Sequence, residues 1–176
     1  MKGRKIYHAR LMHARPFIDS LDFASNGQQI SSEVLVAELS RLDDVLSSPD
    51  GTLSYTIRGE VNKYHIPLLV LHLSGSCQLT CQRCMQSMSY ELRVDTSVLL
   101  RDQTGLDRLD DAEVDEEYES ILADTHLDVW HLLEDEILLS LPFAPKHELG
   151  SCRSASGVMA QQNEPHPFAA LMKLKS

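Results

Sequence analysis

Four cysteines are the residues of this chain whose type and spacing could do chemistry. Cys77, Cys81 and Cys84 lie in one short stretch, and Cys152 stands far downstream, five residues after His147. Two thiolates separated by two residues can hold one soft metal ion from a tight turn. The pair Cys81 and Cys84 therefore predicts half of a zinc site, and His147 and Cys152 are its candidate second half. Cys77 is a substitute candidate for the fourth ligand.

The same stretch has two other interpretations. Its C-x3-C-x2-C spacing is one that can hold an iron–sulfur cluster and is similar to the cluster motif of radical S-adenosylmethionine enzymes. Those enzymes need a large partial barrel, but only about ninety residues follow Cys84. Arg83 stands where that motif usually has an aromatic residue, and no glycine-rich cofactor loop follows. The remaining alternative is that the thiols are left over from an ancestral metal site and bind nothing.

The sequence gives little support for catalysis. A cysteine nucleophile needs an activated thiolate and an orienting third group, and no pattern here indicates them. Glu134, Asp135 and Glu136 are consecutive, so on a helix they point in different directions and do not form an acid–base pair. We therefore expect a protein that is not an enzyme and has no small-molecule substrate.

Charge and composition limit the class of partner. The chain has 176 residues, with 26 acidic against 16 Lys and Arg residues, which gives a net charge of -10. Such a balance argues against indiscriminate binding to nucleic-acid phosphates. No apolar run is long enough for a membrane helix, and the basic N-terminus is not followed by the apolar stretch of a secretory signal. We therefore expect a cytoplasmic protein without membrane contact, whose cysteines stay reduced.

The elements that position these residues follow from hydrophobic periodicity. Leucines at helical spacing predict an amphipathic helix over residues 31–46, capped by Ser31 or Ser32. Alternating patterns predict strands near residues 52–60, 65–73 and 88–95, which short links should pair antiparallel. A second helix is expected over residues 126–141, capped by Thr125 and stopped by Pro142.

These elements predict one α+β domain over residues 16–152. Its core would be an antiparallel sheet or partly closed barrel from residues 52–100, packed by the two main helices. A basic arm, residues 1–15, precedes it, and residues 107–124 form an acidic loop expected to be solvated and mobile. Residues 153–176 are expected to be a flexible linker and a short apolar tail with basic residues.

The order of these features resembles the YceD family, the large ribosomal RNA subunit accumulation proteins of bacteria. The resemblance runs from about residue 15 to the end of the chain. Its most specific parts are the segment from Glu134 to Pro142 and the terminal Pro167-Phe168-Ala169. The pair Cys81 and Cys84 alone would not carry it. Some members have more cysteines in the segment that matches residues 145–155, where this chain has only His147 and Cys152.

The resemblance implies a non-enzymatic factor in the synthesis, processing or accumulation of large-subunit (23S) ribosomal RNA. Its partner would be the precursor RNA or a ribosomal protein. Direct RNA contact would need a local basic patch, for which the sequence offers these residues on or near the predicted strands: Arg58, Lys63, Arg83, Arg93 and Arg101. The competing hypothesis is an acidic adaptor that binds a basic ribosomal protein without touching RNA. No cofactor is certain, and structural zinc is the candidate.

Overall fold

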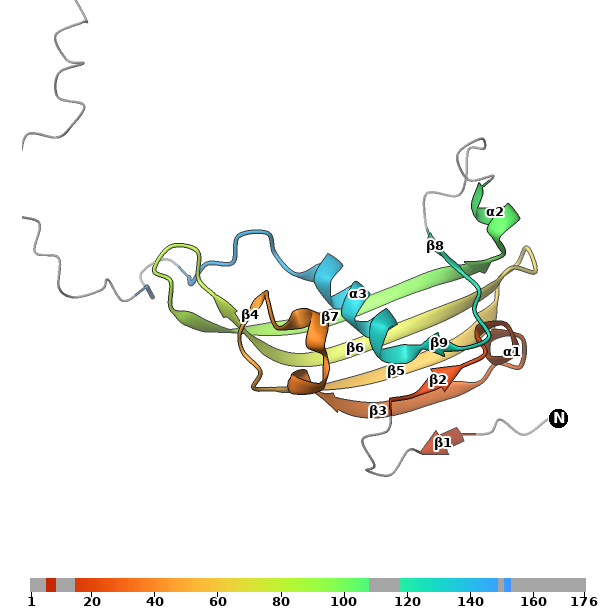
Figure 1. Cartoon of the computed structure of the whole chain (residues 1–176), viewed down its shortest axis with the longest axis horizontal. Helices are drawn as coiled ribbons and strands as arrows, with labels where there is room; N and C mark the ends of the chain where they lie inside the picture. Colours follow the sequence, from red (N-terminus) through yellow and green to blue (C-terminus); the bar gives the residue numbers. More distant parts are fainter. Residues whose placement is uncertain (1–5, 9–14, 108–117, 149–150, 153–176) are drawn as a thin grey trace, which may run out of the picture.

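The computed structural model describes residues 6–8, 15–107, 118–148 and 151–152. Within them the chain forms a seven-stranded sheet and a separate two-stranded ribbon (Figure 1). The ribbon pairs β2 (Phe17–Ile18) with β9 (Leu127–Asp128). The strands of the main sheet are β1 (Ile6–His8), β3 (Gln29–Leu35), β4 (Leu46–Ser48), β5 (Thr52–Val61), β6 (Pro67–Thr80), β7 (Ser87–Arg101) and β8 (Glu119–Leu122).

The centre of the sheet is the antiparallel meander β5–β6–β7, as the alternating sequence patterns predict. Along β5, Leu53 and Ile57 are buried while Ser54 between them is exposed, which is the expected two-residue period. β6 begins at Pro67, where a missing N–H does least harm to a sheet. Both β6 and β7 are longer than predicted, so their hairpin carries the cysteine pair at its tip.

The sheet is open. Its strands follow the order β1-β3-β5-β6-β7-β8, with β4 beside β6, and both outer pairings, β1 with β3 and β7 with β8, are parallel. The predicted α+β class is confirmed, but the strands described here do not close into a barrel. The sheet is therefore mixed, with an antiparallel centre and parallel edges.

The helix predicted over residues 31–46 is wrong. Its first part is strand β3, which pairs with β5, and two short 3-10 turns follow, η1 (Val36–Glu38) and η2 (Ser40–Leu42). Two of the leucines that suggested the helix do not share a buried face: Leu35 is 43% exposed, and Leu46 lies in β4. The buried residues are instead Val34, Val36, Leu39 and Leu42. Their spacings of two and then three residues fit a strand followed by 3-10 turns.

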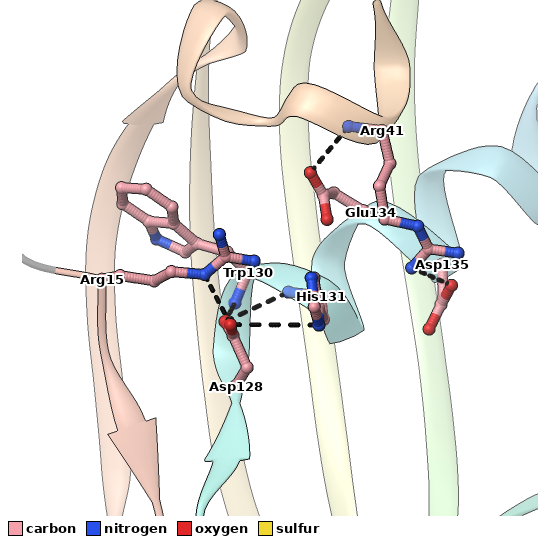
Figure 2. A network of polar contacts seen from close by, with 7 residues as sticks. All are labelled: Arg15, Arg41, Asp128, Trp130, His131, Glu134 and Asp135. Carbon is pink, nitrogen blue, oxygen red and sulfur yellow. Dashed lines mark hydrogen bonds and ion pairs between the residues drawn. The ribbon is translucent and has the colours of Figure 1, made fainter.

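The second predicted helix is present as α3 (Val129–Ser140) and lies over the meander (Figure 1). Its cap is Asp128 rather than Thr125, because the Asp128 carboxylate accepts hydrogen bonds from the backbone N–H groups of Trp130 and His131. The guanidinium of Arg15 forms an ion pair with the same carboxylate and lies 5.7 Å from the Trp130 ring (Figure 2). The last residue of the predicted basic arm is thus bound to the domain.

The core lies between α3 and one face of the sheet. Val129, Leu133 and Ile137 of α3 are fully buried against strand residues such as Ile57 and Leu71. Two smaller helices, α1 (Ser20–Ser25) and α2 (Gln103–Asp107), complete the described structure. None of its helices is long and apolar enough to span a membrane.

Parts of the predicted terminal segments and of the acidic loop lie outside the described residues. These parts are residues 1–5, 9–14, 108–117 and 153–176. Of the predicted acidic loop, Glu119–Leu122 is not loop but strand β8, paired with β7 from Val98 to Arg101. The loop prediction is therefore wrong for that part of the chain.

Candidate metal centre

The first half of the site is the tip of the β6–β7 hairpin. Cys81 directly follows β6, and its backbone both accepts a hydrogen bond from the N–H of Met85 and donates one to the carbonyl of Gln86. Met85 has a φ of 57°, in the left-handed region, which turns the chain sharply back into β7. This tight turn brings Cys81 and Cys84 to the same side of the hairpin tip.

The second half arrives from the end of α3. After Pro142 the chain runs back along the hairpin tip, where the backbone N–H of Gln82 donates to the carbonyl of Pro145 over 2.8 Å. His147 follows two residues later, and its backbone N–H lies 3.5 Å from the Cys81 sulfur. This contact, between residues 66 apart in sequence, brings His147 to the cysteine pair.

The four predicted ligands lie together. Cys81, Cys84, His147 and Cys152 each present one ligand atom, and these atoms are all within 4.8 Å of one another. The Sγ atoms of Cys81 and Cys152 are 3.7 Å apart, too far for a disulfide. His147 Nδ1 lies 3.4 Å from Cys84 Sγ and 3.7 Å from Cys152 Sγ.

Three of these distances are close to the edges of a zinc tetrahedron. Zn–S bonds of about 2.3 Å and Zn–N bonds of about 2.0 Å place neighbouring ligand atoms roughly 3.5–3.8 Å apart in a tetrahedral site. Three of the six separations between ligand atoms, 3.4, 3.7 and 3.7 Å, lie in or at the edge of that range, and the other three are at most 4.8 Å. The residues present therefore fit a four-coordinate Cys3His centre, which is a usual ligand set for structural zinc.

The environment favours a thiolate at Cys81. Burial alone would raise the pKa of this thiol, but hydrogen bonds from the backbone of His147, Arg83 and Cys84, together with the His147 side chain, lower it to about 5. The pKa of Cys84 is raised: the backbone of Gln86 lowers it, but burial and the neighbouring thiols Cys152 and Cys81 outweigh that effect. Metal binding requires deprotonated thiols, so a thiolate at Cys81 with the other ligands already nearby favours it.

Arg83 joins the two halves and is the residue that the sequence analysis did not connect with the site. Its Nε donates to Cys152 Sγ over 2.9 Å, and its Nη2 lies 3.4 Å from the His147 carbonyl and 3.3 Å from that of Glu148. Cys152 is also the main cause of the raised pKa of Arg83. The sequence does contain a signal for this role, because Arg83 is a cation between two cysteines. Three thiolates and one Zn²⁺ leave a net negative charge, beside which a cation is favourable.

Cys77 lies outside the centre. It is a buried residue of β6 paired with Tyr90, and burial raises the pKa of its thiol. Among the described residues the one group of three or more candidate metal ligands is the Cys3His set, and it does not include Cys77. The substitute role for Cys77 is therefore wrong. The geometry also does not support the iron–sulfur interpretation, which needs Cys77, Cys81 and Cys84 together.

The basic residues near the strands do not form one patch. Arg83 lies at the hairpin tip, whereas Arg101 ends the 15-residue strand β7, about 45 Å away along an extended strand. Arg58 is paired with Glu60, and Arg101 donates to Ser120. Any RNA contact by the described residues would therefore use a smaller basic group than all five residues together.

The three consecutive acidic residues of α3 point apart, as predicted, and two of them are buried. Glu134 is fully buried and accepts a hydrogen bond from the backbone N–H of Arg41, while exposed Asp135 pairs with the Arg41 guanidinium (Figure 2). Glu136 is also buried, on another side of the helix. The triplet anchors α3 to its neighbours.

Comparison with known proteins connects both halves of the centre to one family. The family model described as "Large ribosomal RNA subunit accumulation protein YceD" matches residues 69–175. A protein of the same name from Haemophilus influenzae is 29% identical over 145 residues, which cover 75% of this chain and 76% of the relative. No solved structure matches the chain.

Proposed function

We propose, since this chain belongs to the family of the large ribosomal RNA subunit accumulation protein YceD, that it supports the synthesis, processing or accumulation of large-subunit (23S) ribosomal RNA. The match over residues 69–175 is the observation that carries this proposal. The relative from Haemophilus influenzae, aligned over three quarters of both chains, supports it. The protein would work in the cytoplasm, where bacterial ribosomes are assembled.

The proposed role is non-enzymatic. The Cys3His set supplies four protein ligands, so a metal held there would have no open position for water or substrate. Closed sites of this kind stabilise a fold, whereas catalytic zinc keeps one position free. This ligand count supports a binding or assembly factor over a hydrolase.

Zinc in this centre would fix the segment after α3 to the hairpin tip. Outside the Cys3His set, few described contacts join the segment after α3 to the hairpin tip. The backbone N–H of Gln82 donates to the carbonyl of Pro145. The Arg83 guanidinium contacts the sulfur of Cys152 and the carbonyls of His147 and Glu148. Two long-range ligands, His147 and Cys152, would close loops of more than sixty residues with Cys81 and Cys84, and ordering such loops is where a metal contributes most. We propose structural zinc for this reason.

In mechanism, the protein would hold precursor RNA during early assembly of the large subunit. The chain has a net charge of -10, so contact with RNA would be local and not driven by overall charge. The basic residues that precede the domain, Lys2, Arg4, Lys5 and Arg10, carry no acidic neighbour in sequence and are the segment best suited to phosphate.

Crosslinking in cells, followed by sequencing of the attached RNA, tests the proposed RNA contact. Enrichment of large-subunit precursor RNA is expected, with loss of most of the signal when the four basic residues are changed to Ser. Enrichment no higher than background, together with crosslinks to a basic ribosomal protein, would favour the protein-only adaptor instead. Replacing the acidic residues of 108–117 by their amides is the matched test for that adaptor, since it leaves β8 intact.

A further inference from the structure

An open groove, lined by both apolar and polar residues, lies next to the candidate metal centre. It has a volume of about 600 Å³ and runs between the β4 end of the sheet and the last turn of α3. Leu46, Leu138 and Leu141 pack partly against the core and present the rest of their surface to the groove. Leu79 and Pro145 belong to the same lining, so the groove reaches the hairpin that carries Cys81.

Two large apolar side chains stand exposed at the groove margin. Phe143 is fully exposed, and Val45 on the opposite side is 43% exposed. Burial of one such side chain is worth about 1.5–3 kcal/mol, so leaving both in water is costly unless something covers them. Asp44 lines the same groove, and Asp43 beside it is exposed. The occupant should therefore be apolar with positive charge.

The chain itself supplies a segment of that chemistry. Residues 165–176 contain Phe168, Leu171, Met172 and Leu174 together with Lys173 and Lys175, and they contain no acidic residue. The family match runs from residue 69 to residue 175, so it covers this segment together with the metal ligands and the part of the groove formed by the hairpin, α3 and Pro145. The segment itself lies outside the described residues.

The described chain also ends in the right place. Cys152 Sγ is 3.7 Å from Cys81 Sγ. Gln82, which follows Cys81 in the sequence, lines the groove and donates a backbone hydrogen bond to the carbonyl of Pro145. From Cys152 to Phe168 the chain can span at most about 55 Å, so reach does not prevent docking. A segment tethered this close has a high local concentration, and weak intrinsic affinity is sufficient to hold it.

We propose that residues 168–174 of the same chain bind in this groove. Phe168 and the leucines would cover Leu138, Leu141 and Phe143, and Lys173 or Lys175 would lie beside Asp44. Metal binding would support this docking, because Pro145 forms part of the groove and His147, two residues later, is a candidate ligand. That last dependence rests on the proposed zinc centre, whereas the docking itself does not.

Zero-length carbodiimide crosslinking of the full chain at low concentration, followed by mass spectrometry, tests the proposal. The expected product joins Lys173 or Lys175 to Asp44 or Asp43 within one molecule. It should be lost in the variant Phe168→Ala/Leu171→Ala. It should persist in Leu139→Ala, which removes an exposed leucine of α3 that is not part of the groove. Crosslinks only between two copies, only to other carboxylates, or none at all would overturn it.

Hydrogen exchange gives a second readout that does not depend on a crosslink. Backbone amides of residues 138–146 should exchange roughly tenfold faster in Phe168→Ala/Leu171→Ala than in the unchanged chain. Amides in the middle of β6, far from the groove, should be unaffected, which shows that the variant is folded. Equal exchange of residues 138–146 in the two proteins would contradict the docking.

Discussion

The guanidinium of Arg83 donates from Nε to the sulfur of Cys152 over 2.9 Å, although 69 residues separate them in sequence. This contact places a positive charge beside the clustered thiols, and Nη2 of the same guanidinium lies within hydrogen-bond distance of the carbonyls of His147 and Glu148. It connects the hairpin tip to the segment after α3 even before any metal is considered. The residue between the two hairpin cysteines therefore has a structural role of its own.

Changing Cys81 and Cys84 to Ser should remove stoichiometric zinc. If zinc is present at a hundred times its dissociation constant, its loss lowers the free energy of unfolding by about 3 kcal/mol. Metal analysis of the purified protein and denaturant titration measure the two effects. Cys77→Ala is the matched control. Cys77 is buried in β6 outside the cluster, so this variant should keep its zinc. Equal zinc content in the double variant would refute the site.

Replacing Arg83 by Met should weaken zinc binding by roughly tenfold, the low end of what loss of a group contacting a ligand costs. The zinc affinity of Arg83→Lys should lie between that of Arg83→Met and that of the unchanged chain. Lysine keeps the positive charge but lacks the forked guanidinium that reaches Cys152 and the two carbonyls. Competition with a chromogenic chelator measures the affinity. Identical affinities in all three proteins would mean that Arg83 does not act on the metal.

Glu134→Ala should destabilise the protein by about 2–4 kcal/mol. The change leaves a cavity and removes the acceptor for the Arg41 backbone N–H, which lies 3.1 Å from Glu134 Oε1 (Figure 2). Glu134→Gln should cost much less, because the amide oxygen still accepts and Oε2 has no hydrogen-bond partner among the described residues. Exposed Asp135→Asn, expected to cost less than about 1 kcal/mol, is the control for thermal unfolding.

Glu136 should make stability depend on pH. Burial, with the nearby charges of Glu119 and Asp135, raises the pKa of this carboxyl, and a hydrogen bond with Thr96 only partly opposes the shift. A folded-state pKa above the unfolded one means that stability is lost as pH rises from the ordinary carboxyl range through the raised value. Glu136→Gln should therefore be more stable than the unchanged chain at neutral pH.

The gain from Glu136→Gln should disappear below about pH 4, where the carboxyl is protonated in both states. Chemical denaturation at a series of pH values measures it, with Glu91→Gln as the control, because Glu91 is an exposed residue of β7. A gain that stays the same at every pH would show that the charge of Glu136 is not the cause.

The parts of the fold that the sequence predicts are those governed by local patterns. The alternation in β5 and the stop at Pro142 follow from side-chain and backbone sterics within a few residues. Residues 31–46 were mispredicted because leucine spacing alone suits a helix, whereas pairing with β5 across Ser31 and Thr56 decides the structure. That pairing joins distant segments and leaves no local trace.

The candidate site divides in the same way. Cys81 and Cys84 are recognisable from their spacing, and His147 and Cys152 were the residues left to complete the set. The structure brings all four together. Arg83 and Glu134 were not assigned structural roles, because their partners, Cys152 and the Arg41 N–H, are 69 and 93 residues away. Contacts between residues this far apart in sequence cannot be predicted without the tertiary structure.

The level of mature 23S relative to 16S ribosomal RNA, after depletion of the protein in its host, tests the central claim most directly. The expected result is a fall in 23S of several fold, with 16S unchanged and full recovery when the unchanged chain is restored. Recovery should be impaired with Cys81→Ser/Cys84→Ser and normal with Cys77→Ala. An unchanged ratio of 23S to 16S in depleted cells would contradict a role in accumulation of large-subunit ribosomal RNA.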